Sequence, residues 1–458
     1  MRELLILSVG FVMAMLDVTA VNVALPDIAS SLDVPLTGLV WVIDAYTLTF
    51  ASLLLAGGAI ADRFGAKKAY QSGLGIFVLG SALCGAAPIG GMLIAARLIQ
   101  GIGAALFMPS SLSLLTHRYT DDGVRATMLG IWSALVGAAA AVGPLVGGAL
   151  IYFFGWRSVF LMNIPLGLLG ALLTQKYFGP VASHAVRLPM LPHALSAVSI
   201  AALSFVLIEG PSRGWASLSI IAAAAVMASA AFIVVLRERI SKDPILPREM
   251  LAVPGFAAIN GAGFLNNFAV FGQIFLLGFY FQEGQASSAL RAGILLLPTM
   301  LGVTVGNITS SRISKRIGMR NTMLCGWSIG ALTAVLVVLL GGSSPYFFVV
   351  GLASISALAV GSAVPAMTTV MMQMAGTRHA NSAAATLNAN RQIGALVGVA
   401  VIGTVLHSVA AWNQRLILSF VVFSAAYALA GLLVYRFINT ANVQDRAKPL
   451  PESSRRLR

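Results

Sequence analysis

Three ionisable side chains lie inside long apolar stretches of the sequence, where charge is costly. Asp17, Asp44 and Arg97 each interrupt such a stretch. Ionisable groups in these places are usually retained because they move ions or protons. Burial opposes the charge of an aspartate, whereas an arginine nearby favours it. An aspartate under both influences could gain and lose a proton, so we expect a proton-exchange site here. A static buried ion pair is the structural alternative.

The composition shows what surrounds these groups. Of the 458 residues, 10% are charged and 58% are hydrophobic, and the mean hydropathy is +0.89. A soluble domain carries about 25% charged residues, so these values nearly exclude a water-soluble enzyme. They also exclude a disordered chain, which would be polar and rich in charge. The sequence therefore predicts a membrane protein.

Fourteen apolar runs are long enough to cross a bilayer as helices. They are 4–25, 38–60, 69–87, 91–115, 126–153, 158–178, 192–209, 216–236, 254–281, 290–311, 321–340, 345–374, 384–407 and 414–437. These runs are too long and too evenly apolar for the strands of a β-barrel. We therefore expect an all-α fold with fourteen transmembrane helices.

The basic residues predict how the chain is oriented. Of its 29 lysines and arginines, 23 fall on one side of the fourteen runs and 4 on the other, if the N-terminus is cytoplasmic. This excess follows the positive-inside rule and predicts that both termini are cytoplasmic. The same placement between apolar runs argues against nucleic acid as a partner, despite a net charge of +14. The first run has no signal-peptide cleavage pattern, so we expect it to be retained.

A weak internal repeat predicts two related halves. The loops at 57–68 and 307–320 both carry basic residues around a glycine, and glycine tracts at 137–148 and 394–403 occupy matching runs. Duplicated six-helix halves are typical of transporters. The expected segments are a six-helix bundle at 1–178, an inserted helix pair with linkers at 179–253, a second six-helix bundle at 254–438 and a basic tail at 439–458.

Two tracts carry a resemblance to a known family. The loop from Gly58 through Asp62, Arg63 and Gly65 to Lys68 resembles the signature loop of the major facilitator superfamily, although Ala66 replaces a basic residue of that signature. The tract at 93–109, with Arg97 and Gly101, is similar to the fourth-helix motif of the family, whose arginine is linked to proton transfer. Glycines in these tracts permit close helix contact.

Two further tracts narrow the resemblance to the drug:proton antiporters with fourteen spans. The tract at 137–148, with Gly137, Gly143, Pro144 and Gly147, resembles the fifth-helix signature of antiporters, in which small residues pack tightly and the proline kinks the helix. The tract at 16–26, with Asp17 and Asn22, resembles the first-helix signature of that subfamily. The resemblance covers nearly the whole chain and implies two six-helix bundles that rock about a midplane cavity.

The resemblance also implies a class of cargo. Asp44 lies in the tract from Trp41 to Tyr46, where quaternary-ammonium efflux pumps carry an acid. This similarity favours lipophilic cations, with Asn22, Trp41 and Tyr46 among the substrate-binding residues. An exporter or facilitator of an endogenous metabolite or nutrient with the same fold is the alternative. The resemblance implies a location in the bacterial inner membrane, and we expect a functional monomer.

The ninth run offers a candidate wall for a flat apolar ligand. Amide and phenyl side chains recur there at helical spacing, and aromatic faces attract cations. They are Asn260, Phe264, Asn267, Phe268, Phe271 and Phe275. A packing or lipid-facing stripe is the alternative. Arg391, within the thirteenth run, has no deep acid in its own half. Its open alternatives are bonds to backbone carbonyls, an approach to the cytoplasmic gate, and anion binding.

No residue pattern points to a cofactor, a metal or catalysis. Cys84 and Cys325 lie far apart in apolar runs, so they offer no metal-binding spacing. The tract at 326–330 matches a serine-nucleophile pattern, but it lies within an apolar run and lacks the strand-to-helix turn that a nucleophile needs. We therefore expect a transporter driven by the proton gradient, not an enzyme, with a small molecule, protons and lipid as its partners.

Overall fold

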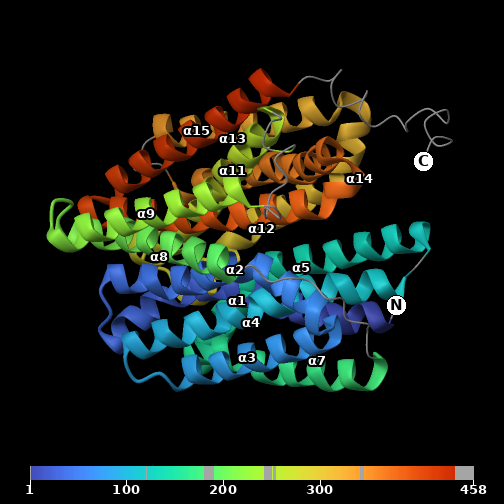
Figure 1. Cartoon of the computed structure of the whole chain (residues 1–458). Coiled ribbons are helices and arrows are strands. Elements are labelled where there is room, and N and C mark those ends of the chain that lie inside the picture. The colour runs from blue at the N-terminus through green and yellow to red at the C-terminus, as the bar shows by residue number, and fades with distance from the viewer. Residues whose placement is uncertain are drawn as a thin grey trace.

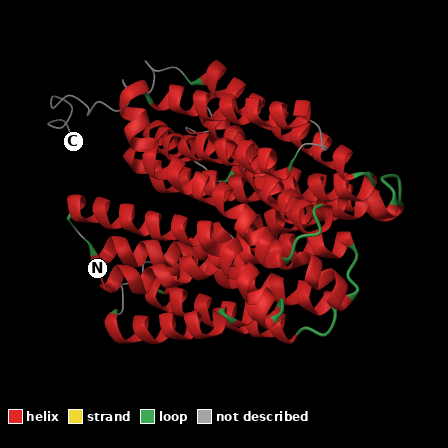
Figure 2. Cartoon of the chain, turned by 180° about the vertical axis from the view of Figure 1, so that it is seen from behind, coloured by secondary structure: helices red, strands yellow, loops and turns green. Residues whose placement is uncertain are grey.

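The structure is a computed structural model that describes residues 2–119, 121–179, 190–241, 250, 254–340 and 345–438. Across these ranges the chain forms helices joined by short turns, and none of it is strand (Figure 2). The expected basic tail at 439–458 lies outside the described residues, as do 180–189 and 242–249 of the expected linkers.

The helices fall into three groups along the chain. The first group is α1 (Arg2–Leu32), α2 (Leu36–Phe64), α3 (Ala66–Ala86), α4 (Gly90–Arg118), α5 (Asp122–Phe154), α6 (Arg157–Leu161) and α7 (Asn163–Tyr177). The second is α8 (Met190–Arg213) and α9 (Leu218–Ile240). The third is α11 (Pro254–Phe279), the π-helical turn η1 (Tyr280–Gly284), α12 (Ala289–Ile317), α13 (Met319–Leu340), α14 (Tyr346–Ser408) and α15 (Trp412–Phe437).

Among the described residues, fourteen helical segments are long and apolar enough to cross a membrane, which confirms the predicted count. Helices α6 and α7 together form one of these segments. Helix α14 contains two, Tyr346–Ala375 and Thr386–Ser408. The interruption expected between the twelfth and thirteenth runs is therefore helical rather than a loop. Residues 376–385 are rich in alanine, the best helix former, and contain no proline.

Figure 1 shows two bundles stacked on each other, with α1–α7 below and α11–α15 above. Helices α8 and α9 lie at the left of the view, where the two bundles meet, and α14 folds back at the right. We call the right-hand end, where α1 begins, the proximal end and the opposite end, with the turn at 33–35, the distal end. The ribbons of the two bundles diverge toward the proximal end in both views (Figures 1 and 2).

Glycines bring the helices of the first bundle into close contact. A Cβ atom on Gly101 of α4 would collide with the backbone oxygen of Tyr46 and the hydroxyl of Thr49, both in α2. The Thr49 hydroxyl also donates to the Leu98 carbonyl at 2.9 Å, across the same contact. Small residues take this role in membrane helices because lipid supplies no hydrophobic drive for association. The contact fixes α2 against α4, which carry Asp44 and Arg97.

We predict that Gly101→Ala destabilises the protein, because the added methyl group must push α2 away from α4. Overpacking of this kind costs about 1–3 kcal/mol. Thermal unfolding of the detergent-purified protein measures the effect as a lower midpoint. Gly75→Ala in α3 is the matched control, since an added Cβ there meets nothing within 4 Å. Equal midpoints for the two variants would contradict the close contact.

Candidate functional site

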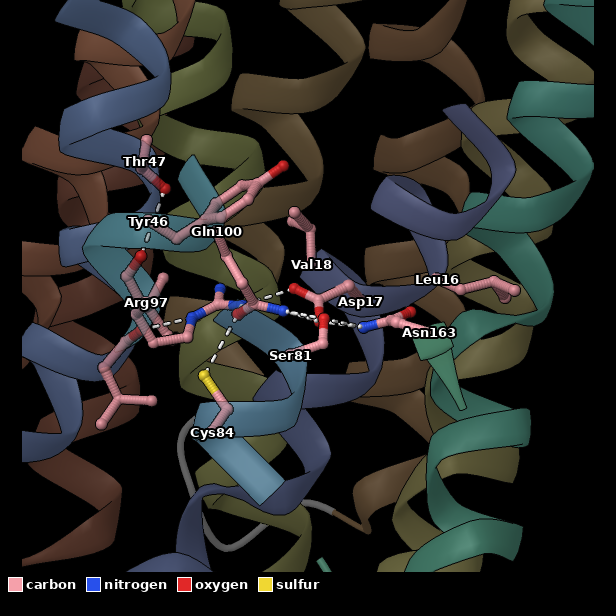
Figure 3. A network of polar contacts seen from close by, with 12 residues as sticks. Leu16, Asp17, Val18, Tyr46, Thr47, Ser81, Cys84, Arg97, Gln100 and Asn163 are labelled. Carbon is pink, nitrogen blue, oxygen red and sulfur yellow. Dashed lines mark hydrogen bonds and ion pairs between the residues drawn. The ribbon is translucent and has the colours of Figure 1, made fainter. Parts of the chain in front are cut away.

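A buried polar network in the first bundle is built around Asp17. This residue lies fifteen residues from each end of α1 and is 0% exposed. The Arg97 guanidinium, carried by α4, donates from Nη1 to Asp17 Oδ2 and forms an ion pair with it (Figure 3). The same nitrogen donates to Gln100 Oε1 at 2.8 Å. The expected contact between Asp17 and Arg97 is therefore present.

Uncharged residues from α3, α4 and α7 complete the network. Asn163 Nδ2 donates to Asp17 Oδ1 at 2.9 Å, and Gln100 Nε2 donates to Ser81 Oγ at 2.6 Å. Arg97 Nε donates to the Val42 carbonyl at 2.9 Å. Sequence reasoning assigned no role to Gln100, Ser81 or Asn163, because neutral polar residues in apolar runs carry no charge that marks them. The carboxylate of Asp17 is thus paired and fully hydrogen-bonded.

Tyr46 covers the guanidinium of this network. The Arg97 Cζ atom lies 4.6 Å from the centre of the Tyr46 ring, which is a cation–π contact. Tyr46 is only 2% exposed. In this conformation Tyr46, a predicted substrate-binding residue, is therefore buried within the first bundle and packs on Arg97.

Asp44 lies apart from this network. Its side chain is 0% exposed, and neither carboxylate oxygen has a hydrogen-bond partner among the described residues. The surface of α2 formed by Val42 and Thr49 contacts α4. Val40 lies one turn before Asp44, on the surface of α2 opposite to the one that contacts α4. It packs against Gly403 of α14, where an added Cβ would collide with it. The helical repeat places Asp44 on that same surface, toward the second bundle.

The glycine–proline tract of α5 packs against two helices. Added Cβ atoms on Gly143 and Gly147 would collide with Thr19 and Ala20 of α1. One on Gly293 of α12 would collide with the Pro144 carbonyl of α5. The tract thus holds α1 on one side and the second bundle on the other.

Further contacts between the bundles lie in the distal half or near the middle of their helices. The Thr304 hydroxyl of α12 donates to the Gly137 carbonyl of α5 at 2.9 Å. Gln282 Nε2 of η1 donates to the Val23 carbonyl of α1 at 3.0 Å. An added Cβ on Gly278 would touch the backbone of Asn22, whose side chain donates to the Val18 carbonyl within α1. Asn22 therefore lies at a contact between α1 and α11.

Helix α8 bridges the two bundles at the distal end. Trp41 Nε1 of α2 donates to Glu209 Oε1 of α8 at 3.0 Å. The Thr404 hydroxyl of α14 donates to the Leu207 carbonyl of α8 at 3.3 Å. Trp41, a predicted substrate-binding residue, thus ties the inserted pair to α2. A small hollow between these three helices is lined partly by Val40, Ile208 and Gly403.

The predicted aromatic wall on α11 divides by burial. Phe264 and Phe271 are half-buried, whereas Phe275 and Phe268 are 0% and 9% exposed and belong to the hydrophobic core. The Phe264 and Phe268 rings are stacked, with their centres 6.4 Å apart. Only part of the expected wall is therefore accessible in this conformation.

A second polar group joins α11 to α13 and α14. Arg391 Nε donates to Asn267 Oδ1 at 3.2 Å, and Asn266 Nδ2 donates to the same oxygen at 3.3 Å. Trp327 Nε1 donates to Asn266 Oδ1 at 2.9 Å. Asn260 lies nearby, where its carbonyl accepts a hydrogen bond from Asn390 Nδ2 at 2.6 Å. Arg391 and Asn267, which sequence reasoning considered separately, are thus in contact.

The signature loop forms the proximal turn between α2 and α3. Gly65 has a φ of 94°, a conformation that favours glycine. An added Cβ on Gly58 would lie 3.9 Å from Pro109 of α4, so this glycine is not tightly packed. Arg63 is exposed and lies over the Phe64 ring, and the side chain of Asp62 is outside the described residues.

Comparison with known proteins agrees with this architecture. A methylenomycin A resistance protein of Bacillus subtilis (strain 168) is 47% identical over 96% of this chain and 94% of its own length. A protein of the same description from Streptomyces coelicolor is 44% identical over 94% of this chain and 91% of its own length. The multidrug resistance protein Stp of Mycobacterium tuberculosis (strain CDC 1551 / Oshkosh) is 32% identical over 88% and 75%.

A crystal structure of the peptide transporter POT in complex with sulfate shares the fold. Its TM-score is 0.72 at 14% identity, over 98% of this chain and 96% of that one. The Major Facilitator Superfamily model matches residues 7–399 and, in a second match, 259–454. Together with the fourteen spans, these matches show that the chain is a membrane transporter, not an enzyme, and that it belongs to the Major Facilitator Superfamily.

Proposed function

We propose that this chain exports small drug-like molecules across the plasma membrane in exchange for protons. Relatives named as methylenomycin A and multidrug resistance proteins, which match most of the chain, support the export of drugs. The proposal of proton exchange rests on a single observation. The carboxyl group of Asp44 is buried, has no partner in the described chain, and lies on the surface of α2 that faces the second bundle.

Asp44 is suited to exchange a proton because nothing in its described surroundings compensates a charge. An ionised carboxylate enclosed without a partner costs several kcal/mol, and protonation removes that cost. Water solvates the ionised form readily. The group therefore favours the protonated form when it is enclosed and the ionised form when it is open to water. A protein that alternates between the two conformations therefore binds the proton in one and releases it in the other.

Asp17 and Arg97 are proposed as the fixed partners of this exchange. Asp17 accepts hydrogen bonds from Arg97 and Asn163, so its charge is compensated without a proton. The network joins α1, α3, α4 and α7 and lies within one bundle. We infer that it keeps that bundle rigid while the bundles rock, and that Asp44 is the principal proton carrier.

The contacts between the bundles support a conformation that is closed at the distal end. Val40 packs against Gly403, and Gly293 packs against Pro144, in the distal half of their helices. Rocking that separates these pairs would expose the surface of α2 that carries Asp44. Cargo and proton would then compete for the exposed surface. Each shifts the equilibrium between the two conformations only by the difference between its affinities for them.

We propose that the distal end faces the outside of a bacterial inner membrane and that both termini are cytoplasmic. The excess of basic residues at the proximal end supports this orientation. Arg118 pairs with Glu3 there, and Lys67 donates to the Phe178 carbonyl. A functional monomer and a cationic cargo stay predictions. The cationic cargo requires an accessible Asp44, and in this conformation Asp44 is enclosed.

We predict that Asp44→Asn abolishes drug-dependent proton flux, because an amide cannot exchange the proton. Proteoliposomes with an internal pH dye measure this flux after addition of a transported drug. Asp33→Asn is the matched control, since Asp33 is exposed in the distal turn. Flux at the wild-type rate in Asp44→Asn would refute the assignment of the carrier.

We predict that Asp17→Asn lowers stability by about 3–5 kcal/mol, because it leaves the buried Arg97 charge without its partner. The double variant Asp17→Asn with Arg97→Gln should recover part of this loss, since it removes both charges. Chemical unfolding of purified protein compares the two. A single variant as stable as the wild type would contradict the structural role of the pair.

We predict opposite accessibility for cysteines placed at the two ends. In a cysteine-free background, Ser217→Cys, between α8 and α9, should react with an impermeant maleimide added to intact cells. Lys68→Cys at the proximal end should react only after the membrane is opened. The reverse pattern would place the termini outside.

A further inference from the structure

Arg391 carries a charge that its own bundle does not compensate. Glu283 is the only acid anywhere between residues 254 and 438, and it is exposed at the distal end. Among the described residues no carboxylate lies within ion-pair distance of Arg391. The first bundle contains the opposite arrangement, in which Arg97 is paired with Asp17. An arginine held within the membrane without a counter-charge is costly and by default functional.

The guanidinium of Arg391 has donors that make no hydrogen bond within the described part of the chain. Its Nε donates to Asn267 Oδ1, which holds the planar group in place. No partner for the two terminal nitrogens is present in the described part of the chain, and the residue as a whole is half-buried. Such a fork matches the two oxygens of a carboxylate and can bind both at once.

The surroundings of Arg391 suit an apolar body attached to that carboxylate. Its side-chain stem lies beside Gly263, where an added Cβ would be 3.2 Å from Arg391 Cγ. Phe264 follows Gly263 directly on α11, and both Phe264 and Phe271 are half-buried. A half-buried arginine at this depth faces the interior of the protein or water rather than lipid.

We propose that Arg391, positioned by Asn267, binds the carboxylate of a lipophilic weak acid, whose apolar part packs against Phe264 and Phe271. This inference rests on the proposed function and names a class of its cargo. It runs against the cationic cargo favoured by the resemblance, because an uncompensated arginine repels cations. Lysine would keep the charge at this position but would lose the two-pronged contact.

Three ligands of one shape test the proposal on the full-length protein in nanodiscs. They are 2-naphthylacetate, the neutral 2-naphthylacetamide and the cationic 2-(2-naphthyl)ethylammonium, with binding measured by equilibrium dialysis. We expect the wild type to bind the carboxylate about ten- to a hundredfold more tightly than the amide, as a charge-assisted contact provides. The ammonium compound should bind most weakly. Equal affinity for carboxylate and amide would overturn the proposal.

Variants assign that preference to one side chain. In Arg391→Gln the carboxylate and the amide should bind about equally, with the amide affinity unchanged within about twofold. Arg391→Lys should keep an intermediate preference. Arg320→Gln, at a half-buried arginine of the same bundle that contacts the Tyr435 carbonyl, should keep the full preference. Loss of all binding in both Arg391 variants, or a wild-type preference in Arg391→Gln, would contradict direct recognition.

The outcome is separable from that of the proposed export. Binding is measured without a proton gradient, so it does not depend on Asp44 carrying the proton. Should the carboxylate preference be absent while Asp44-dependent proton flux is present, the class of cargo is wrong and the exchange mechanism stands. A clear preference for the carboxylate, combined with proton flux that does not depend on Asp44, would mean that the class of cargo is right and that the assignment of Asp44 is wrong.

Discussion

Removing a carboxylate from water into a membrane protein costs several kcal/mol unless a partner or a proton compensates its charge. The chain meets this constraint in two ways. Asp17 is compensated by Arg97 and by the amide of Asn163, all within the first bundle. Asp44 has no such partner among the described residues and lies on the surface of α2 that turns toward the second bundle. In the proposed mechanism the first arrangement holds the bundle together, whereas the second exchanges the proton.

The packing of the helices gives this difference a mechanical context. Glycines hold α2 tightly on α4, so Asp44 and Arg97 belong to one rigid unit. The contacts between the bundles are of another kind, because they join the two units that the proposed rocking would separate. The Gly–Pro tract of α5 serves both purposes, since Gly143 contacts α1 and Pro144 contacts Gly293 of α12. A carboxyl group at the contact between the bundles would become exposed to water if the bundles separated, whereas one inside a bundle would stay buried.

Composition and apolar run length were enough to predict the all-helical fold and its fourteen spans, because a bilayer sets the length of every element. Contact of Arg97 with a buried aspartate was also predictable, since few charges are present, but the choice of Asp17 over Asp44 was not. The neutral members of the network were not predictable either, because Gln100, although it lies in the tract at 93–109, carries no charge that would assign it a partner. Helical spacing grouped the α11 phenyl rings on one broad surface but could not separate half-buried Phe264 from fully buried Phe275. That distinction depends on neighbours far away in sequence.

Infrared difference spectroscopy of the reconstituted protein tests most directly whether Asp44 is the side chain that carries the proton. The carbonyl stretch of a protonated carboxyl group is separate from that of a carboxylate, and isotope labelling of aspartate identifies its source. The account predicts a protonated aspartate band in the resting protein that decreases when a transported drug binds and is missing in Asp44→Asn. A band that ignores the drug, or one that persists in the variant, would contradict it.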